Sequence, residues 1–130
     1  MLIARSAAAQ ESAMREAHFQ SKLLRALRQR MPEAVIWKLS DRWTCGVPDV
    51  MVSLRGVVTW FELKTQSNDV TRIQAEWLKR LVRGHVVRCD TVSGKLWYFC
   101  GTVPLGESDI FHTESFDKLV QHLERLCLND

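Results

Sequence analysis

The strongest constraint on the fold is a short turn between two runs of β-forming residues, 48–54 and 57–64. Only Arg55-Gly56 separates the two runs, so the sequence predicts an antiparallel hairpin closed by a tight turn. If Leu54 and Val57 flank the turn, Asp49 lies directly opposite Glu62. A longer turn closing on Ser53 and Val58 keeps the same register.

This register predicts an unusual pair of acidic side chains. Directly opposed residues in a hairpin have Cβ atoms about 5 Å apart and share one face of the sheet. Lys64 follows Glu62 by two positions and therefore points to the same face. The carboxylates of Asp49 and Glu62 would repel each other, and Lys64 supplies only one positive charge. Mg²⁺ prefers such oxygen ligands. The alternative is a salt-bridge cluster at a sheet edge.

The rest of the chain predicts one α/β domain spanning residues 1–130. Residues 1–9 carry little periodic signal and are expected to form a flexible arm. The order α-β-β-β-α-β-β-α indicates a mixed β-sheet flanked by helices. The expected helices are residues 10–30, 70–83 and 116–128, and the expected strands are residues 34–39, 48–54, 57–64, 85–92 and 95–100.

Composition narrows the class of protein. The apolar fraction of 46% and the charged fraction of 25% exclude intrinsic disorder. No apolar run reaches the about 18 residues of a membrane span, so we expect no membrane partner. The net charge of +3 is compatible with a nucleic-acid partner. The four cysteines form no Cys-x-x-Cys pair, which predicts buried thiols in a reducing, cytoplasmic setting.

Two helical positions carry polar residues where apolar ones are expected. Glu16 falls on the apolar stripe of the first helix, beside Phe19 and Leu23, and such a glutamate needs a partner. The alternative is that Glu16 extends past the core into solvent. Gln74 interrupts the stripe of the second helix. It also completes a Thr71-x-x-Gln74 capping box, and both roles can hold together.

These residues together resemble the PD-(D/E)XK nuclease superfamily, and within it the VRR-NUC group of short stand-alone proteins of phages and bacteria. The resemblance covers residues 16–87, and residues 95–130 lie outside it. The matching pattern is Glu16-x-x-Phe19-Gln20, Gly46-Val-Pro-Asp49, Glu62-Leu-Lys64 and Gln74-x-x-Trp77-Leu78.

The resemblance implies a restriction-endonuclease-like fold and a Mg²⁺-dependent nuclease, with Mn²⁺ able to substitute. Asp49, Glu62 and the backbone carbonyl of Leu63 would hold the metal, and Glu16 would touch it directly or through water. Lys64 would position the attacking water and stabilise charge at the phosphate. Gln74 completes the set of candidate catalytic residues. The location implied is the cytoplasm of a bacterium or of a phage-infected host.

Contacts to DNA are expected beside the loop that leads to Asp49. Lys38, Arg42 and Trp43 suit phosphate contacts and base stacking there. The alternative is a solvated loop with one packed tryptophan. The amphipathic segment 116–128 suggests a homodimer, and the resemblance implies branched DNA such as a four-way junction. That helix can equally well cover the sheet.

Three functions therefore compete on the sequence alone. The first is a Mg²⁺-dependent DNA endonuclease, selective for branched DNA. The second is a catalytically silent nucleic-acid-binding module that retains the nuclease fold. The third is a structural subunit whose carboxylates form only a salt-bridge network. Paired acids in apolar strands favour the first, because a protein without a bound cation is better off without them.

Overall fold

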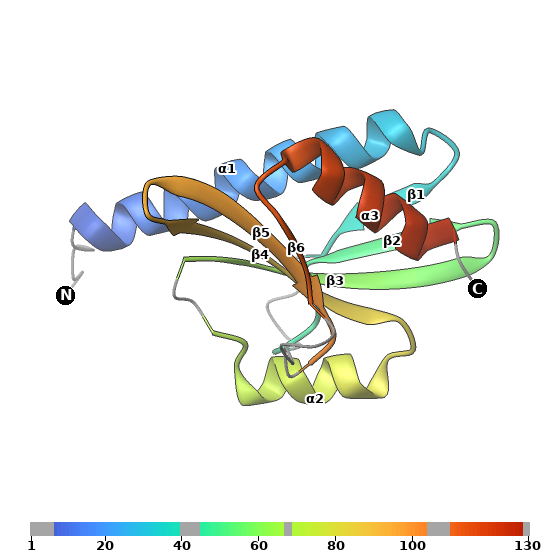
Figure 1. Cartoon of the computed structure of the whole chain (residues 1–130). Helices are drawn as coiled ribbons and strands as arrows, with labels where there is room; N and C mark the ends of the chain where they lie inside the picture. Colours follow the sequence, from blue (N-terminus) through green and yellow to red (C-terminus); the bar gives the residue numbers. More distant parts are fainter. Residues whose placement is uncertain (1–6, 40–44, 67–68, 104–109, 129–130) are drawn as a thin grey trace.

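The computed structural model describes residues 7–39, 45–66, 69–103 and 110–128. Within them the chain forms a six-stranded mixed sheet and three helices (Figure 1). The elements are α1 (Ala7–Arg30), β1 (Val35–Lys38), β2 (Val50–Leu54), β3 (Val57–Thr65), α2 (Arg72–Arg80), β4 (Gly84–Val92), β5 (Lys95–Gly101), β6 (Phe111–Thr113) and α3 (Phe116–Leu128). The mixed α/β class expected from the sequence is confirmed.

The strands lie in the sheet in chain order, from β1 at one edge to β6 at the other. All neighbours are antiparallel except β3 and β4, which are parallel. Parallel neighbours need a crossover connection, and α2 provides it. Helix α2 lies on one side of the sheet, whereas α1 and α3 lie together on the other (Figure 1).

The β2–β3 hairpin has the predicted register. Leu54 pairs with Val57, and the ladder continues to Val50 opposite Phe61. Arg55 and Gly56 have φ angles of 53° and 81°. Positive φ at both central residues is the signature of the type I′ turn, whose twist matches that of the strands. The ladder ends at Val50 and Phe61. Its register, continued by one residue, brings Asp49 next to Glu62.

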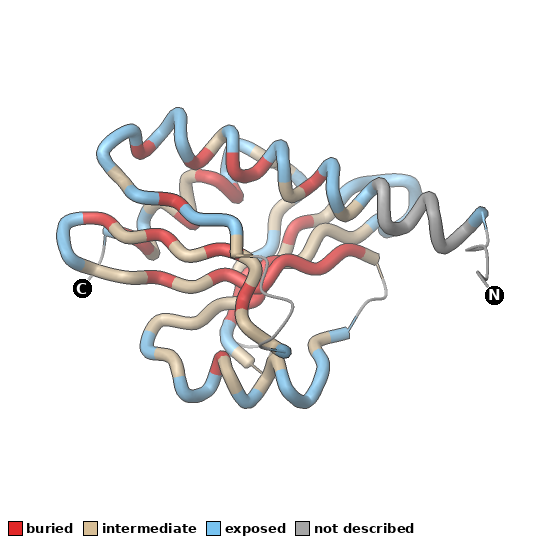
Figure 2. Tube along the Cα trace, turned by 180° about the vertical axis from the view of Figure 1, so that it is seen from behind, coloured by how far each residue is buried: buried red, intermediate tan, exposed pale blue. Residues whose placement is uncertain are grey.

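The hydrophobic core lies between the sheet and the pair α1 and α3. On α1, the stripe of Phe19, Leu23 and Leu27 is buried as predicted. Figure 2 shows buried positions on the helices and along the central strands. On α3 the apolar residues are buried in the same core: Leu119, Val120, Leu123 and Cys127. Helix α3 therefore covers the sheet, and the surface from which a homodimer was expected is used within the chain.

The predicted element order lacks one strand. The observed order is α-β-β-β-α-β-β-β-α, because β6 pairs with the edge of β5. Three residues are too few to show a period-2 pattern, so no local pattern predicts this strand. Helix α1 begins at Ala7, so residues 7–9 of the expected arm are helical and 1–6 lie outside the described residues. Helix α2 is shorter than expected, because Thr71 caps it and Leu81 is extended.

All four cysteines are free. Cys100 and Cys127 are buried as expected, and Cys89 is partly buried. Cys45 is exposed, which contradicts the expectation that every thiol is buried. Along the described ranges, no helix combines the length and the hydropathy that crossing a membrane requires.

We expect Leu123→Ala in α3 to lower the free energy of unfolding by about 2 to 5 kcal/mol, because it opens a cavity in the core. Leu128→Ala is the matched control in the same helix, since Leu128 is 46% exposed, and should change stability by less than about 0.5 kcal/mol. Urea denaturation measures both. Equal losses in the two variants would contradict the assignment of α3 to the core.

Candidate active site: a buried carboxylate pair beside a lysine

The candidate site lies where β2 begins and β3 ends, on the side of the sheet that faces α2. Successive side chains of β3 alternate between the two faces. Phe61 and Leu63 belong to the core under α1 and α3, so Glu62 and Lys64 point to the opposite face. A hydrogen bond from Gln74 of α2 to Glu62 confirms this orientation. The hairpin and α2 together thus position the site.

Asp49 is held at the end of the hairpin by the backbone of two neighbouring strands. Its carboxylate Oδ2 accepts a hydrogen bond from the Leu63 backbone N–H at 2.8 Å. Its own carbonyl oxygen accepts one from the Leu39 N–H at 2.7 Å. The amide and carbonyl of one residue point to the same edge of a strand, so the Leu63 carbonyl also faces Asp49.

Glu62 is the most deeply buried charged residue of the site, with 2% of its surface exposed. Its Oε1 accepts a hydrogen bond from Gln74 Nε2 at 3.0 Å and lies 3.9 Å from Lys64 Nζ. The other oxygen, Oε2, is buried and has no hydrogen-bond partner among the described residues. Burial, and then the charge of Asp49, raise the pKa of Glu62 to about 9. Without a bound cation, the two carboxyl groups therefore hold one proton between them near neutral pH.

Gln74 has both of the roles that the sequence suggested. Its side-chain Oε1 accepts from the Thr71 backbone N–H at 2.9 Å, and its own backbone N–H donates to Thr71 Oγ1 at 3.2 Å. These two bonds form the predicted capping box of α2. The side-chain Nε2 remains free for Glu62. One amide group thus closes the helix and orients the carboxylate.

Glu16 lies at the margin of the site. It is partly buried on α1, and burial raises its pKa, while the charge of Lys64 lowers it and that of Asp49 raises it. The structure therefore places Glu16 within electrostatic range of both residues. Among the described residues, however, no three His, Cys, Asp or Glu side chains group closely enough to hold a metal ion. Direct ligation by Glu16 stays a prediction.

Gly46 explains how the segment before Asp49 and the helix that carries Gln74 come together in the fold. Its φ of +85° is left-handed, and its Cα packs directly against Ile73 and Trp77 of α2. A Cβ there would lie 2.9 Å from Trp77 Cδ1 and still closer to Ile73. Only glycine fits both the backbone angle and the space. This contact brings the segment that carries Asp49 against α2.

The expected DNA-contacting residues are only partly described. Lys38 is exposed at the end of the edge strand β1, as a phosphate contact requires. Arg42 and Trp43 lie outside the described residues.

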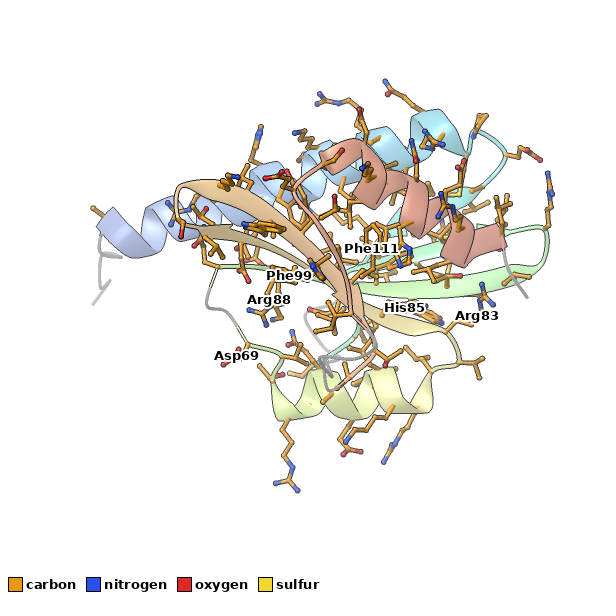
Figure 3. The ribbon with its side chains drawn as sticks, viewed as in Figure 1. Asp69, Arg83, His85, Arg88, Phe99 and Phe111 are labelled. Carbon is orange, nitrogen blue, oxygen red and sulfur yellow. The ribbon has the colours of Figure 1, made fainter. Side chains whose placement is uncertain are left out.

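Sequence reasoning missed Arg88. In the parallel β3–β4 ladder Arg88 pairs with Lys64, so both side chains point to the α2 side of the sheet. Arg88 Nη1 donates a hydrogen bond to the Gln66 carbonyl at 2.9 Å, and Arg88 Nη2 lies 3.6 Å from Asp69 Oδ1. Figure 3 shows Arg88 and Asp69 on the α2 side of the sheet. The alternation of side chains along β4 could have placed Arg88 on the face of the sheet opposite the core. That Arg88 lies beside Lys64 depends on the register of the β3–β4 crossover, which no local pattern predicts. The site therefore contains a second cation.

The carboxylate pair fits a hard divalent cation better than a salt-bridge network. Lys64 is the only cation paired with Glu62 among the described residues, at the long distance of 3.9 Å, and Arg88 is paired with Asp69 instead. Lys64 balances the pair only while the two carboxyl groups share a proton, and one buried Glu62 oxygen receives no hydrogen bond from a donor of the described residues. A divalent cation would replace that proton. Two carboxylates with waters and substrate phosphates are the ligand set that Mg²⁺ prefers.

Comparisons with known proteins do not extend this assignment. No family model matches the chain, and no curated protein is significantly similar to it in sequence. The family resemblance therefore stays a prediction that rests on the motif residues.

We expect the pKa of Glu62 to make stability fall with rising pH in metal-free buffer. The folded protein keeps this carboxyl protonated up to about pH 9, whereas in the unfolded chain it ionises near 4.5. Between these values the unfolded state binds fewer protons, so each pH unit lowers the free energy of unfolding by up to about 1.4 kcal/mol. Urea denaturation between about pH 7 and pH 8 measures this slope, and Glu62→Gln should flatten it.

The pH window avoids other titrations. Burial raises the pKa values of Cys89, Cys100 and Cys127 from 9.0 to about 11, 12 and 11, so their ionisation in the unfolded chain lowers stability mainly above about pH 8. Burial lowers the pKa of His85 to about 4, so the folded state resists its protonation and stability falls as pH drops below 6.5. The effect of His85 on stability is opposite in sign to that of Glu62, and it is complete below the pH range of the measurement. Glu76→Gln, at an exposed position of α2, is the control and should retain the parent slope. A Glu62→Gln protein with the parent slope would contradict the assigned pKa.

Proposed function

We propose that this protein is a metal-dependent nuclease that hydrolyses phosphodiester bonds in DNA, with a restriction-endonuclease-like fold similar to that of the VRR-NUC group. One observation carries the proposal. Glu62 is buried beside Asp49, and one of its oxygens receives no hydrogen bond from a donor of the described residues. Such a pair destabilises the fold unless a shared proton or a cation compensates it, and a divalent cation would take the place of the proton.

The carboxylates of Asp49 and Glu62 would hold Mg²⁺ or Mn²⁺, together with the Leu63 carbonyl. When bound, such a cation acts as a Lewis acid and lowers the pKa of water. Gln74 fixes the Glu62 carboxylate through the bond to Oε1, which leaves Oε2 free for the ion. Glu16, at the margin of the site, would contribute through water.

Lys64 would act on the substrate. Its ammonium group is buried on the same face as the carboxylates and lies 3.9 Å from Glu62 Oε1. A lysine held there can orient the attacking water and stabilise the negative charge that develops on the phosphate. Arg88 is the neighbour of Lys64 on β4, and its exposed partner Asp69 can give way to a phosphate oxygen. The two cations thus suit one phosphodiester group.

A catalytically silent nucleic-acid-binding module is the alternative function. It explains the net charge of +3 and the exposed Lys38 equally well. It gives no reason for a buried carboxylate pair, since anionic groups weaken binding to a phosphate backbone. The Asp49–Glu62 pair therefore favours the enzyme.

The oligomer and the shape of the DNA form a separate part of the proposal. The apolar stripe of α3 is buried in the core, so a homodimer would need another surface. The exposed Val35 and Trp37 on the edge strand β1 offer an apolar one. Selectivity for branched or four-way-junction DNA rests on the resemblance alone.

We expect Asp49→Asn and Glu62→Gln each to lower Mg²⁺-dependent cleavage by about 100-fold or more, because each removes a charged ligand. Lys64→Met should lose a similar amount and still bind Mg²⁺. The assay compares linear, nicked, flapped and four-way-junction DNA, with and without Mg²⁺. Glu76→Gln is the control and should cleave like the parent. Parent-like cleavage by Asp49→Asn would overturn the assignment, and binding without cleavage by the parent would favour the silent module.

We expect millimolar Mg²⁺ or Mn²⁺ to raise the midpoint of thermal unfolding at neutral pH. A ligand at 100 times its Kd stabilises the folded state by about 2.7 kcal/mol. Binding also displaces the proton from the Glu62 pair, so the midpoint should rise more at high pH than at low pH. Glu62→Gln should show no such rise. Sodium chloride at matched ionic strength is the control, and an equal effect of both salts would contradict a specific site.

A further inference from the structure

A second feature of the molecule is a cavity of about 480 Å³ between the N-terminal half of α1 and the strands β4 and β5. It lies on the face of the sheet opposite the carboxylate pair, at the point where β3 ends. Thr65, the residue directly after Lys64, forms part of its wall. The cavity therefore adjoins the proposed active site through a single peptide unit.

The floor of the cavity is apolar. Phe19 and Tyr98, stacked with ring centroids 6.1 Å apart, form its base, but only 5% and 4% of their surfaces are exposed. Leu96 also lines the cavity and is 49% exposed, so it supplies the accessible apolar surface. Burial raises the pKa of the Cys89 thiol to about 11, so this wall residue is neutral at physiological pH. The floor thus suits a flat apolar group.

The rim of the cavity is cationic. Arg15 and Lys22 supply its positive charge, and His18 lies between them. The three residues have three- and four-residue spacing on α1, which places them on one side of the helix. All three side chains are exposed, and the Lys22 ammonium lies 4.1 Å from the ring centroid of Phe116. The rim therefore suits an anionic group at the mouth.

Thr65 provides an unused polar contact inside the cavity. It is only 3% exposed, and its hydroxyl has no hydrogen-bond partner in the part of the chain that the structure describes. A buried hydroxyl without a partner costs free energy unless a ligand or water satisfies it. Its position in the wall points to a ligand with a polar edge.

We propose that this cavity binds one unpaired nucleotide of the nucleic acid, with the base against Leu96 and its phosphate at the cationic rim. Bases bind aromatic and apolar surfaces with little sequence preference, and arginine and lysine bind phosphate. A base inside a duplex is paired and stacked, so an unpaired base can enter such a cavity at a lower cost in free energy. The inference rests on the proposed nuclease function for its biological role, and it gives that function a source of selectivity for branched or frayed DNA.

The test measures binding of thymidine 5′-monophosphate to the metal-free protein by calorimetry or NMR titration, with thymidine and inorganic phosphate as separate ligands. We expect the nucleotide to bind more tightly than either part. Leu96→Glu should weaken nucleotide binding about tenfold or more, because it places an anion on the apolar floor. Val92→Glu is the matched control, since Val92 is 48% exposed on the same hairpin but lies outside the cavity, and should bind like the parent.

A second pair of variants tests the rim. Arg15→Gln should weaken binding of the nucleotide but not of thymidine, whereas Arg25→Gln, on the same helix outside the cavity, should change neither. Parent-like nucleotide binding by Leu96→Glu, or equal affinity for phosphate and nucleotide, would overturn the proposal.

Asp49→Asn separates this inference from the proposed function. It should retain nucleotide binding, because Asp49 does not line the cavity. Nucleotide binding without cleavage by the parent would contradict only the nuclease, and cleavage without nucleotide binding would contradict only the cavity.

Discussion

The antiparallel register of β2 and β3 is the constraint on which the candidate site depends. The two-residue turn at Arg55-Gly56 fixes this register, and the buried face of the hairpin reinforces it. A slip by one residue would send Glu62 into the apolar core and Leu63 out of it. The turn, far from the carboxylates along both strands, thus decides which side chains meet. The hydrogen bond from the Leu63 amide to Asp49 then holds the acidic end of the hairpin together.

The site also illustrates how a binding function opposes stability. A carboxylate as buried as Glu62 is unfavourable in the ionised form, and Asp49 makes it more so. The surrounding fold compensates with a large core under α1 and α3, on the opposite face of the sheet. The apolar core under α1 and α3 therefore stabilises the molecule, while the face of the sheet toward α2 holds the destabilising carboxylates.

Local signals in the sequence predicted much of this arrangement. The hairpin register, the stripes of α1 and α3, and the capping role of Gln74 each depend on residues a few positions apart, and each is confirmed. Arg88 was missed because its neighbour is set by the parallel pairing of β3 with β4, and a long crossover does not encode register as a tight turn does. Strand β6 was missed because it depends on the edge of β5 rather than on its own pattern. The cavity at Thr65 is lined by four elements, α1, β3, β4 and β5, so no local pattern marks it.

The shared use of the Gln74 amide has a dynamic consequence. Its oxygen caps the backbone of Thr71 and its nitrogen binds Glu62, so the side chain cannot turn to improve one contact without losing the other. A change in the charge or position of Glu62 is therefore transmitted to the first turn of α2. Local opening of a helix end exposes its amides to exchange with solvent. The protection of the first backbone amides of α2 against hydrogen exchange thus reports on the charge and position of the Glu62 carboxylate, although Glu62 lies on β3 and not in the helix.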